Sequence, residues 1–192
     1  MEGTETYRRW IQRATVYALS MTAAGAVTGV AFSAAGAGVS TLWSGMTMLL
    51  AGVLGAFALA YALHELELLR LPVPGRHWQV PDDWARIGFY RSAVVFGGTV
   101  GFGVFTRVPF AGLPILLAWF FVSGNVLYAL LAGLVYGATR ALSIYASAST
   151  HEAMDVAQLN QRLMQLAPVA HRAMGVALAA FAAYLLAAPY LP

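Results

Sequence analysis

Five long apolar stretches alternate with short polar segments along the chain and set the pattern of its predicted elements. Four of the stretches are about as long as the twenty or so residues that an α-helix needs to cross a bilayer, and the third is longer by several turns. The pattern predicts an all-α, polytopic transmembrane helix bundle that forms a single membrane domain over residues 1–192. The five predicted spans cover residues 14–37, 44–66, 91–122, 124–146 and 170–189.

The third stretch, residues 91–122, cannot form one straight helix. Within eight residues it holds Arg107, Pro109, Gly112 and Pro114. Each proline removes a backbone donor and disfavours helix at the residue before it. The sequence therefore predicts a helix that breaks near Thr106–Pro109 and restarts near Leu113.

A broken span has two interpretations. In a bilayer, irregular backbone is tolerated only where protein or water satisfies the freed groups, and transporters place such breaks at binding sites. The break is otherwise a tight turn, or a kink that only shapes packing. On the first interpretation, the candidate site for a partner or an anion consists of Thr106, Arg107, Pro109 and Pro114.

Arg107 is the charged residue of this candidate site. It lies about 24 Å of helix rise beyond Arg91, which puts it near the outer edge of a hydrocarbon core roughly 30 Å thick. Its side chain either extends outward to the headgroups or turns inward, toward a partner or an anion.

Two G-x-x-x-G motifs predict close helix packing. The first span holds Gly25 and Gly29, and the fourth holds Gly133 and Gly137. Glycines at this spacing let the backbone of a neighbouring helix approach closely.

The polar segments predict three further features. Residues 69–90 contain three prolines and are expected to form a stiff loop. Residues 147–168 are expected to form an amphipathic surface helix before the last span. At the end of the second span, Glu65 is interpreted as part of a solvated helix end with a local charge pair. Pairing with His64 in a proton relay or metal site is disfavoured, because neighbours in sequence do not face each other on a helix.

Composition supports a membrane class and excludes several kinds of chemistry. Sixty per cent of the residues are apolar and 10% are charged, whereas charged residues make up about 25% of soluble domains. The sequence has no cysteine, which excludes disulfides, thiolate metal sites and dithiol redox chemistry within the chain. No cofactor and no metal site is expected. A nucleic-acid partner is also not expected, because basic and aromatic residues do not interleave.

The arginines predict an orientation. With the N-terminus inside, ten of the eleven arginines fall in the inside segments 1–13, 69–91 and 140–172. This distribution follows the positive-inside rule. We therefore expect a multi-pass protein of a bacterial-type inner (plasma) membrane, with an uncleaved first span, a cytoplasmic N-terminus and the C-terminus outside.

The order of these features resembles the transmembrane domain of the DsbD/CcdA family. The segment GFGVFTRVPFAGLPILLAWF is similar to the fourth helix of that family, and Thr106-Arg107-Val108-Pro109 stands where the family has a Cys-Pro element. The segments GAVTGVAFSAAGAGV and LLAGVLGAFALAYAL are similar to its second and third helices. The resemblance implies a fold derived from two inverted three-helix repeats, in a family that passes electrons through two membrane cysteines.

The chain departs from this family in two respects. The first helix of the first repeat and both cysteines are missing, so neither dithiol electron transfer nor a catalytic residue carries over. The sequence is therefore similar to a shortened, cysteine-free branch, loosely like the membrane proteins of methylamine-utilisation operons.

Two functions remain open at this point. The first is an accessory or structural subunit whose flank, lined by small residues of the first span and by the broken span, binds another membrane protein. The second is a small solute or ion transporter that self-associates and works around residues 91–122. An enzyme is not expected, because no nucleophile and base occur at a useful spacing.

Overall fold

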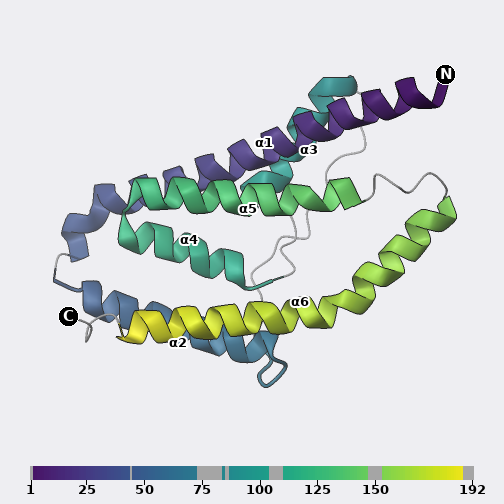
Figure 1. Ribbon diagram of the computed structural model, residues 1–192. Coiled ribbons are helices and arrows are strands. Elements are labelled where there is room, and N and C mark those ends of the chain that lie inside the picture. Colours follow the sequence, from purple (N-terminus) through teal and green to yellow (C-terminus); the bar gives the residue numbers. More distant parts are fainter. Residues whose placement is uncertain are drawn as a thin grey trace. The chain divides into compact units, whose positions relative to one another are not determined.

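Every regular element of the described chain is a helix. The computed structural model describes residues 2–43, 45–72, 84, 87–103, 110–146 and 153–187. These residues form six α-helices and one 3-10 helix (Figure 1): α1 (Glu2–Val39), η1 (Ser40–Trp43), α2 (Thr47–Glu65), α3 (Phe89–Phe102), α4 (Gly112–Ser123), α5 (Val126–Ala146) and α6 (Ala153–Ala187). The predicted all-α class is confirmed.

The helices also agree with a bundle of membrane spans. By length and composition, three of them could cross a bilayer, in the ranges Tyr7–Leu42, Thr47–Glu65 and Met164–Ala187. Two shorter apolar helices, Gly112–Ser123 and Val126–Leu142, accompany them. The first helix is longer than its predicted span, since it begins at Glu2 and continues to Val39.

The predicted break in the third stretch separates α3 from α4. Helix α3 ends at Phe102, because Gly103 adopts the left-handed region with φ 68°, where a glycine is favoured. Helix α4 restarts at Gly112, close to the predicted Leu113. Pro114 is its third residue, where the N–H that proline lacks would have no partner within the helix. Thr106, Arg107 and Pro109 lie outside the described residues.

Helix α6 corrects one prediction. The sequence favours an amphipathic surface helix over 147–168 that ends before a separate last span. The structure instead shows one 35-residue helix that runs through Pro168. A proline costs one hydrogen bond, but the segments on both sides are rich in alanine and leucine, which are strong helix formers. Their propensity outweighs the interruption.

The contacts divide the chain into two compact units. The first unit comprises Met1–Val30, Gly75–Arg107 and Leu127–Ala153, and the second comprises Ala31–Pro74, Val108–Val126 and Met154–Pro192. Helix α1 therefore contributes its part up to Val30 to one unit and its end, from Ala31, to the other.

In the first unit, α1 packs against α3 and α5 through glycines. A Cβ atom on Gly97 of α3 would lie 2.5 Å from the carbonyl oxygen of Tyr17, and one on Gly137 of α5 would lie 2.6 Å from that of Met21. Side-chain contacts agree with this alignment of the helices. Arg13 donates to Ser92 Oγ over 3.0 Å, and the hydroxyls of Tyr145 and Thr15 lie 3.4 Å apart. These pairs make α3 parallel and α5 antiparallel to α1.

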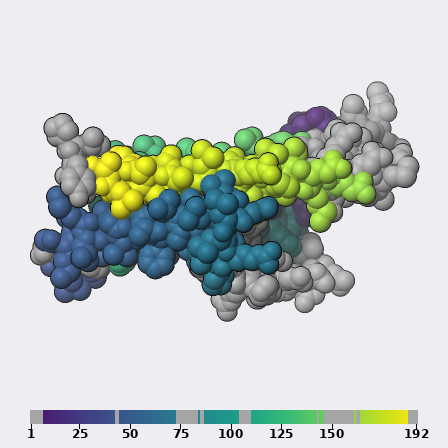
Figure 2. Space-filling model, turned by 90° about the horizontal axis from the view of Figure 1, so that it is seen from below, coloured from purple at the N-terminus to yellow at the C-terminus, as the bar shows by residue number. Residues whose placement is uncertain are grey.

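In the second unit, α2, α4 and α6 enclose an apolar core. Its buried members are Leu54, Ala58, Ala62, Ala111, Ile115, Leu178, Ala182 and Leu185. Gly55 contacts Leu185 and Leu186, and Gly175 contacts Ala62 and Leu66, so α2 and α6 run antiparallel. Figure 2 shows α6 lying along α2.

Candidate functional site

The core of the second unit ends in a buried carboxylate. Along α2, the positions Leu54, Ala58, Ala62 and Glu65 recur every three or four residues, and all four are buried. Glu65 therefore continues the face that packs against α4 and α6. Its side chain is 1% exposed. The expectation of a solvated helix end at Glu65 is wrong, because this residue lies on the packing face of the helix.

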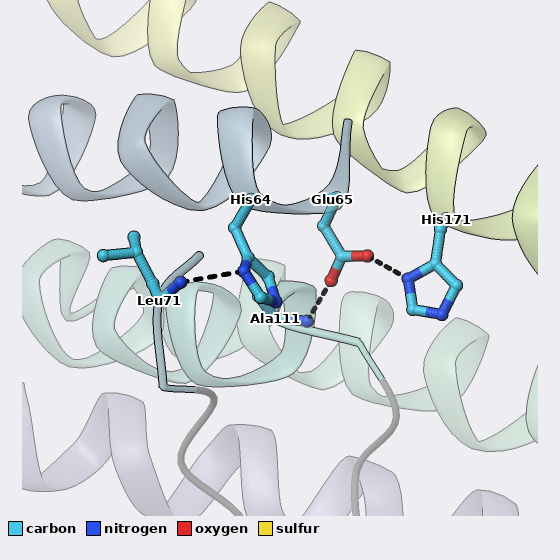
Figure 3. A network of polar contacts seen from close by, with 5 residues as sticks. All are labelled: His64, Glu65, Leu71, Ala111 and His171. Carbon is cyan, nitrogen blue, oxygen red and sulfur yellow. Dashed lines mark hydrogen bonds and ion pairs between the residues drawn. The ribbon is translucent and has the colours of Figure 1, made fainter. Parts of the chain in front are cut away.

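Two groups from distant parts of the sequence hold the Glu65 carboxylate (Figure 3). The backbone N–H of Ala111 donates to Oε1 over 2.7 Å. Nδ1 of His171, on α6, lies 2.5 Å from Oε2. The Glu65 carboxylate thus connects α2 to the beginning of α4 and to the middle of α6.

The first of these contacts places Glu65 at the N-terminus of α4. Ala111 precedes Gly112, the first residue of that helix. The first N–H groups of a helix have no intrahelical acceptor and carry a partial positive charge, so they favour an anion. A site for an external anion at this helix restart was one interpretation of the sequence. In the structure, the chain's own carboxylate accepts a hydrogen bond there.

His171 lies on the corresponding face of α6. His171, Gly175, Leu178, Ala182 and Leu185 recur with spacings of four and three residues, which is the pattern of two tightly packed helices. The imidazole ring also contacts Phe110, with the ring centroids 4.8 Å apart. The His171 side chain is 37% exposed. One edge of the ring is therefore held by Glu65, while part of the ring remains accessible.

His64 has a separate role. Its Nδ1 accepts the backbone N–H of Leu71 over 3.0 Å (Figure 3). This hydrogen bond connects the segment that follows α2 to the end of the helix. The ring also lies edge-on to Tyr61, with the centroids 6.3 Å apart. His64 and Glu65 thus have different partners, as expected for neighbours on a helix. Among the residues that the structure describes, no three His, Cys, Asp or Glu side chains gather closely enough to hold a metal ion.

The residues that the sequence singled out lie in different places. Thr106, Arg107 and Pro109 are outside the described ranges, so the break as a binding site stays a prediction. Pro114 is half-buried in the first turn of α4.

The glycine motifs pack within the first unit. A Cβ on Gly25 would lie 2.5 Å from the carbonyl oxygen of Gly133 and 3.2 Å from the nitrogen of Gly137, so the two motifs meet. Gly29 is also buried. The face of α1 that carries these glycines is therefore covered by this chain's own α5.

Glu65 and His171 were not among the predicted site residues. One usable signal was the spacing of Glu65 from Ala58 and Ala62, which continues a stripe of small apolar residues. The spacing of His171 from Gly175 and Leu178 is a similar signal on α6. No local pattern indicates the register between α2 and α6, however, and the two residues are separated by 106 positions.

The fold and this polar pair define a class: a multi-pass, all-α membrane protein with a buried carboxylate–imidazole contact. Two known proteins have a similar sequence. The chain is 31% identical over 127 residues to the methylamine utilization protein MauF of Paracoccus versutus, a match that covers 65% of this chain and 46% of that relative. It is 35% identical over 108 residues to MauF of Paracoccus denitrificans, covering 54% of this chain and 37% of the relative.

These matches indicate distant homology to MauF and support the expected likeness to membrane proteins of methylamine utilisation. The chain spans less than half the length of either curated relative. No family model matches the chain. No solved structure matches it either.

Proposed function

We propose that this chain is an accessory membrane subunit that binds another membrane protein and serves methylamine utilisation. The observation that carries the proposal is its similarity to MauF, whose name assigns that protein to methylamine utilisation. A cysteine-free relative of the DsbD/CcdA fold is part of the same proposal. Such a chain keeps a helical scaffold and lacks the cysteines through which that family passes electrons.

The outward face of α1 is the surface that suits a partner helix. Its glycine face is covered by α5, so the open flank expected from the sequence cannot be the Gly25 and Gly29 face. Exposed positions on α1 include Leu19, Ala23, Val27, Ala31 and Ala35, which follow one another every four residues. The three alanines among them would let the helix of a second, different membrane chain approach closely.

Co-purification in gentle detergent tests this proposal. A tagged chain produced in its native host should carry a second membrane protein in a fixed ratio. Ala31→Leu should remove that protein and leave this chain folded, because Ala31 is exposed. Ala56→Leu is the matched control, since Ala56 is exposed on α2. A chain that purifies alone in folded form, or a partner that both variants retain, would contradict the proposal.

A small transporter is the second candidate, and one observation favours it. Ionisable side chains within membrane spans often mark ion or substrate pathways, and the Glu65–His171 contact lies where the broken segment restarts. Solute uptake into liposomes that contain the pure chain would support transport. Arg107→Ala should then abolish uptake, whereas uptake that persists in this variant would argue against the predicted site at the break.

A further inference from the structure

Arginines gather in the first unit where α1 and α3 begin and α5 ends. Arg13 of α1 donates to Ser92 Oγ of α3 over 3.0 Å, and the ring of Trp10 lies edge-on to that of Tyr145 of α5, with the centroids 6.5 Å apart. Figure 1 shows the first turns of α3 beside α1. We call this end of the first unit the arginine end. It carries four exposed arginines, namely Arg8, Arg9, Arg13 and Arg91.

Aromatic rings surround these arginines. Tyr7 and Trp10 stack with their centroids 6.4 Å apart, and the rings of Phe89 and Tyr90 lie 5.0 Å apart, edge to face. Tryptophan and tyrosine are enriched where a bilayer meets water, because each ring combines an apolar body with a polar group. The uncharged part of α1 begins directly after Arg13. We therefore expect the arginine end to lie at the depth of the lipid headgroups.

The chain itself does not balance the positive charge of this end. Residues 2–20, 87–96 and 136–146 hold five arginines and two glutamates. In the described structure, no side chain caps the N-terminus of α3, and its first turn contains no acidic residue. The partial positive charge of that N-terminus adds to the charge of Arg13, whose Cζ lies 5.3 Å from the ring centroid of Phe89, the first residue of α3. An anion from outside the chain would relieve this accumulation of like charge.

We propose that the arginine end binds the phosphate of an anionic phospholipid. A guanidinium group donates paired hydrogen bonds to phosphate oxygens. Arg13 is already held by Ser92 and by the ring of Phe89, so it loses little conformational freedom when a phosphate binds. Clusters of basic residues at the ends of membrane helices recognise anionic headgroups in this way.

The apolar surface next to the arginines favours a lipid over a soluble anion. Leu19 of α1 is 65% exposed and Val94 of α3 is 49% exposed, and both lie on the uncharged side of the arginine end. Acyl chains attached to the bound phosphate would lie along these side chains. A soluble anion would satisfy the arginines and leave the apolar positions uncovered.

Native mass spectrometry of the full chain in a neutral detergent tests the proposal. Phosphatidylglycerol and phosphatidylcholine are titrated separately, and the dissociation constant of the first bound lipid is measured. Phosphatidylglycerol should bind at least about fivefold more tightly, because the headgroup of phosphatidylcholine brings a positive charge of its own. Excess inorganic phosphate should not displace the lipid. Equal affinity for the two lipids, or displacement by inorganic phosphate, would overturn the proposal.

Arginine variants locate the binding surface. Arg91→Gln removes an exposed charge from the arginine end and should weaken phosphatidylglycerol binding by about fivefold. Arg13→Gln should weaken it by about tenfold, because the guanidinium that the protein already holds in place is lost. Binding of phosphatidylcholine should stay unchanged in both variants. If Arg13→Gln does not fold, Arg91→Gln still decides.

Arg172→Gln is the matched control. It removes an exposed arginine of α6, in the second unit, and changes the net charge by the same amount. Phosphatidylglycerol binding should change by less than about twofold in this variant. An equal loss in Arg172→Gln and Arg91→Gln would show that only net charge matters and would overturn the proposal. The inference is independent of the proposed accessory function, because the pure chain and a lipid suffice to test it.

Discussion

The two units of the chain hold their helices together by different means. In the first unit, backbone meets backbone at Gly25, Gly97, Gly133 and Gly137. In the second, alanine and leucine side chains fill the space between α2, α4 and α6, and the Glu65–His171 contact closes one end. Lipid tails are as apolar as leucine, so helix association in a membrane depends on close packing and on polar contacts. Both units combine the two, because Arg13 donates to Ser92 in the first, and a Cβ on Gly36 in the second would meet the backbone of Phe121.

The glycine contacts limit where a larger side chain fits. At Gly25, Gly97 and Gly137, even a Cβ atom would lie 2.5–2.6 Å from a backbone oxygen of the neighbouring helix. Glu65 lies at the end of the α2 face, beyond the buried Ala58 and Ala62, where its carboxylate meets the N–H of Ala111 and the ring of His171. The buried ionisable pair accordingly occurs in the second unit, at the end of a face otherwise made of Leu54, Ala58 and Ala62.

The largest expected effect comes from breaking the pair. His171→Leu should lower the free energy of unfolding by about 3 kcal/mol, because it leaves the buried Glu65 carboxylate without its contact to His171. The double variant Glu65→Leu/His171→Leu should recover most of this loss, because no buried charge is left. Reversible unfolding in mixed micelles measures both values. If the double variant lost as much stability as the two single variants combined, the two side chains would not interact.

A smaller effect is expected from adding one methyl group in the first unit. Gly137→Ala should cost about 1–2 kcal/mol, because the new Cβ would lie 2.6 Å from a backbone oxygen of α1 that cannot move aside. Gly52→Ala on α2 is the control, since nothing lies within 4 Å of its Cβ position. This control should be stabilised by about 0.5–1 kcal/mol through helix propensity. Equal effects of the two changes on the melting temperature would contradict the glycine packing.

The smallest effect compares two buried serines, one from each unit. Ser33 is 0% exposed, and its Oγ has no hydrogen-bond partner in the described structure. Ser33→Ala should therefore be neutral or stabilising by up to about 1 kcal/mol. Ser92 is equally buried, but it accepts from Arg13 and donates to the carbonyl of Phe89. Ser92→Ala should cost about 1 kcal/mol in the same unfolding measurement. An equal loss of unfolding free energy in both variants would indicate that the Ser33 hydroxyl does have a hydrogen-bond partner.

Features that are local in sequence were predictable, and features that depend on helix register were not. The apolar stretches, the restart near Leu113 and the glycine motifs are each formed by residues close together in sequence and have a direct physical meaning. The end of a helix at Pro168 was predicted wrongly, because the propensity of the surrounding residues outweighed one lost hydrogen bond. The contact of Glu65 with His171 depends on the antiparallel alignment of α2 with α6, which no local pattern encodes.

The length of α1 has a consequence for the surrounding lipid. The helix carries no charge from Ala14 to Val39, a stretch of about 39 Å at 1.5 Å per residue. That exceeds the roughly 30 Å thickness of an average hydrocarbon core, and such hydrophobic mismatch is relieved by tilting or by local thickening of the bilayer. Lipids with longer acyl chains should relieve more of it. We therefore expect the tilt of α1 to depend on the acyl-chain length of the host membrane.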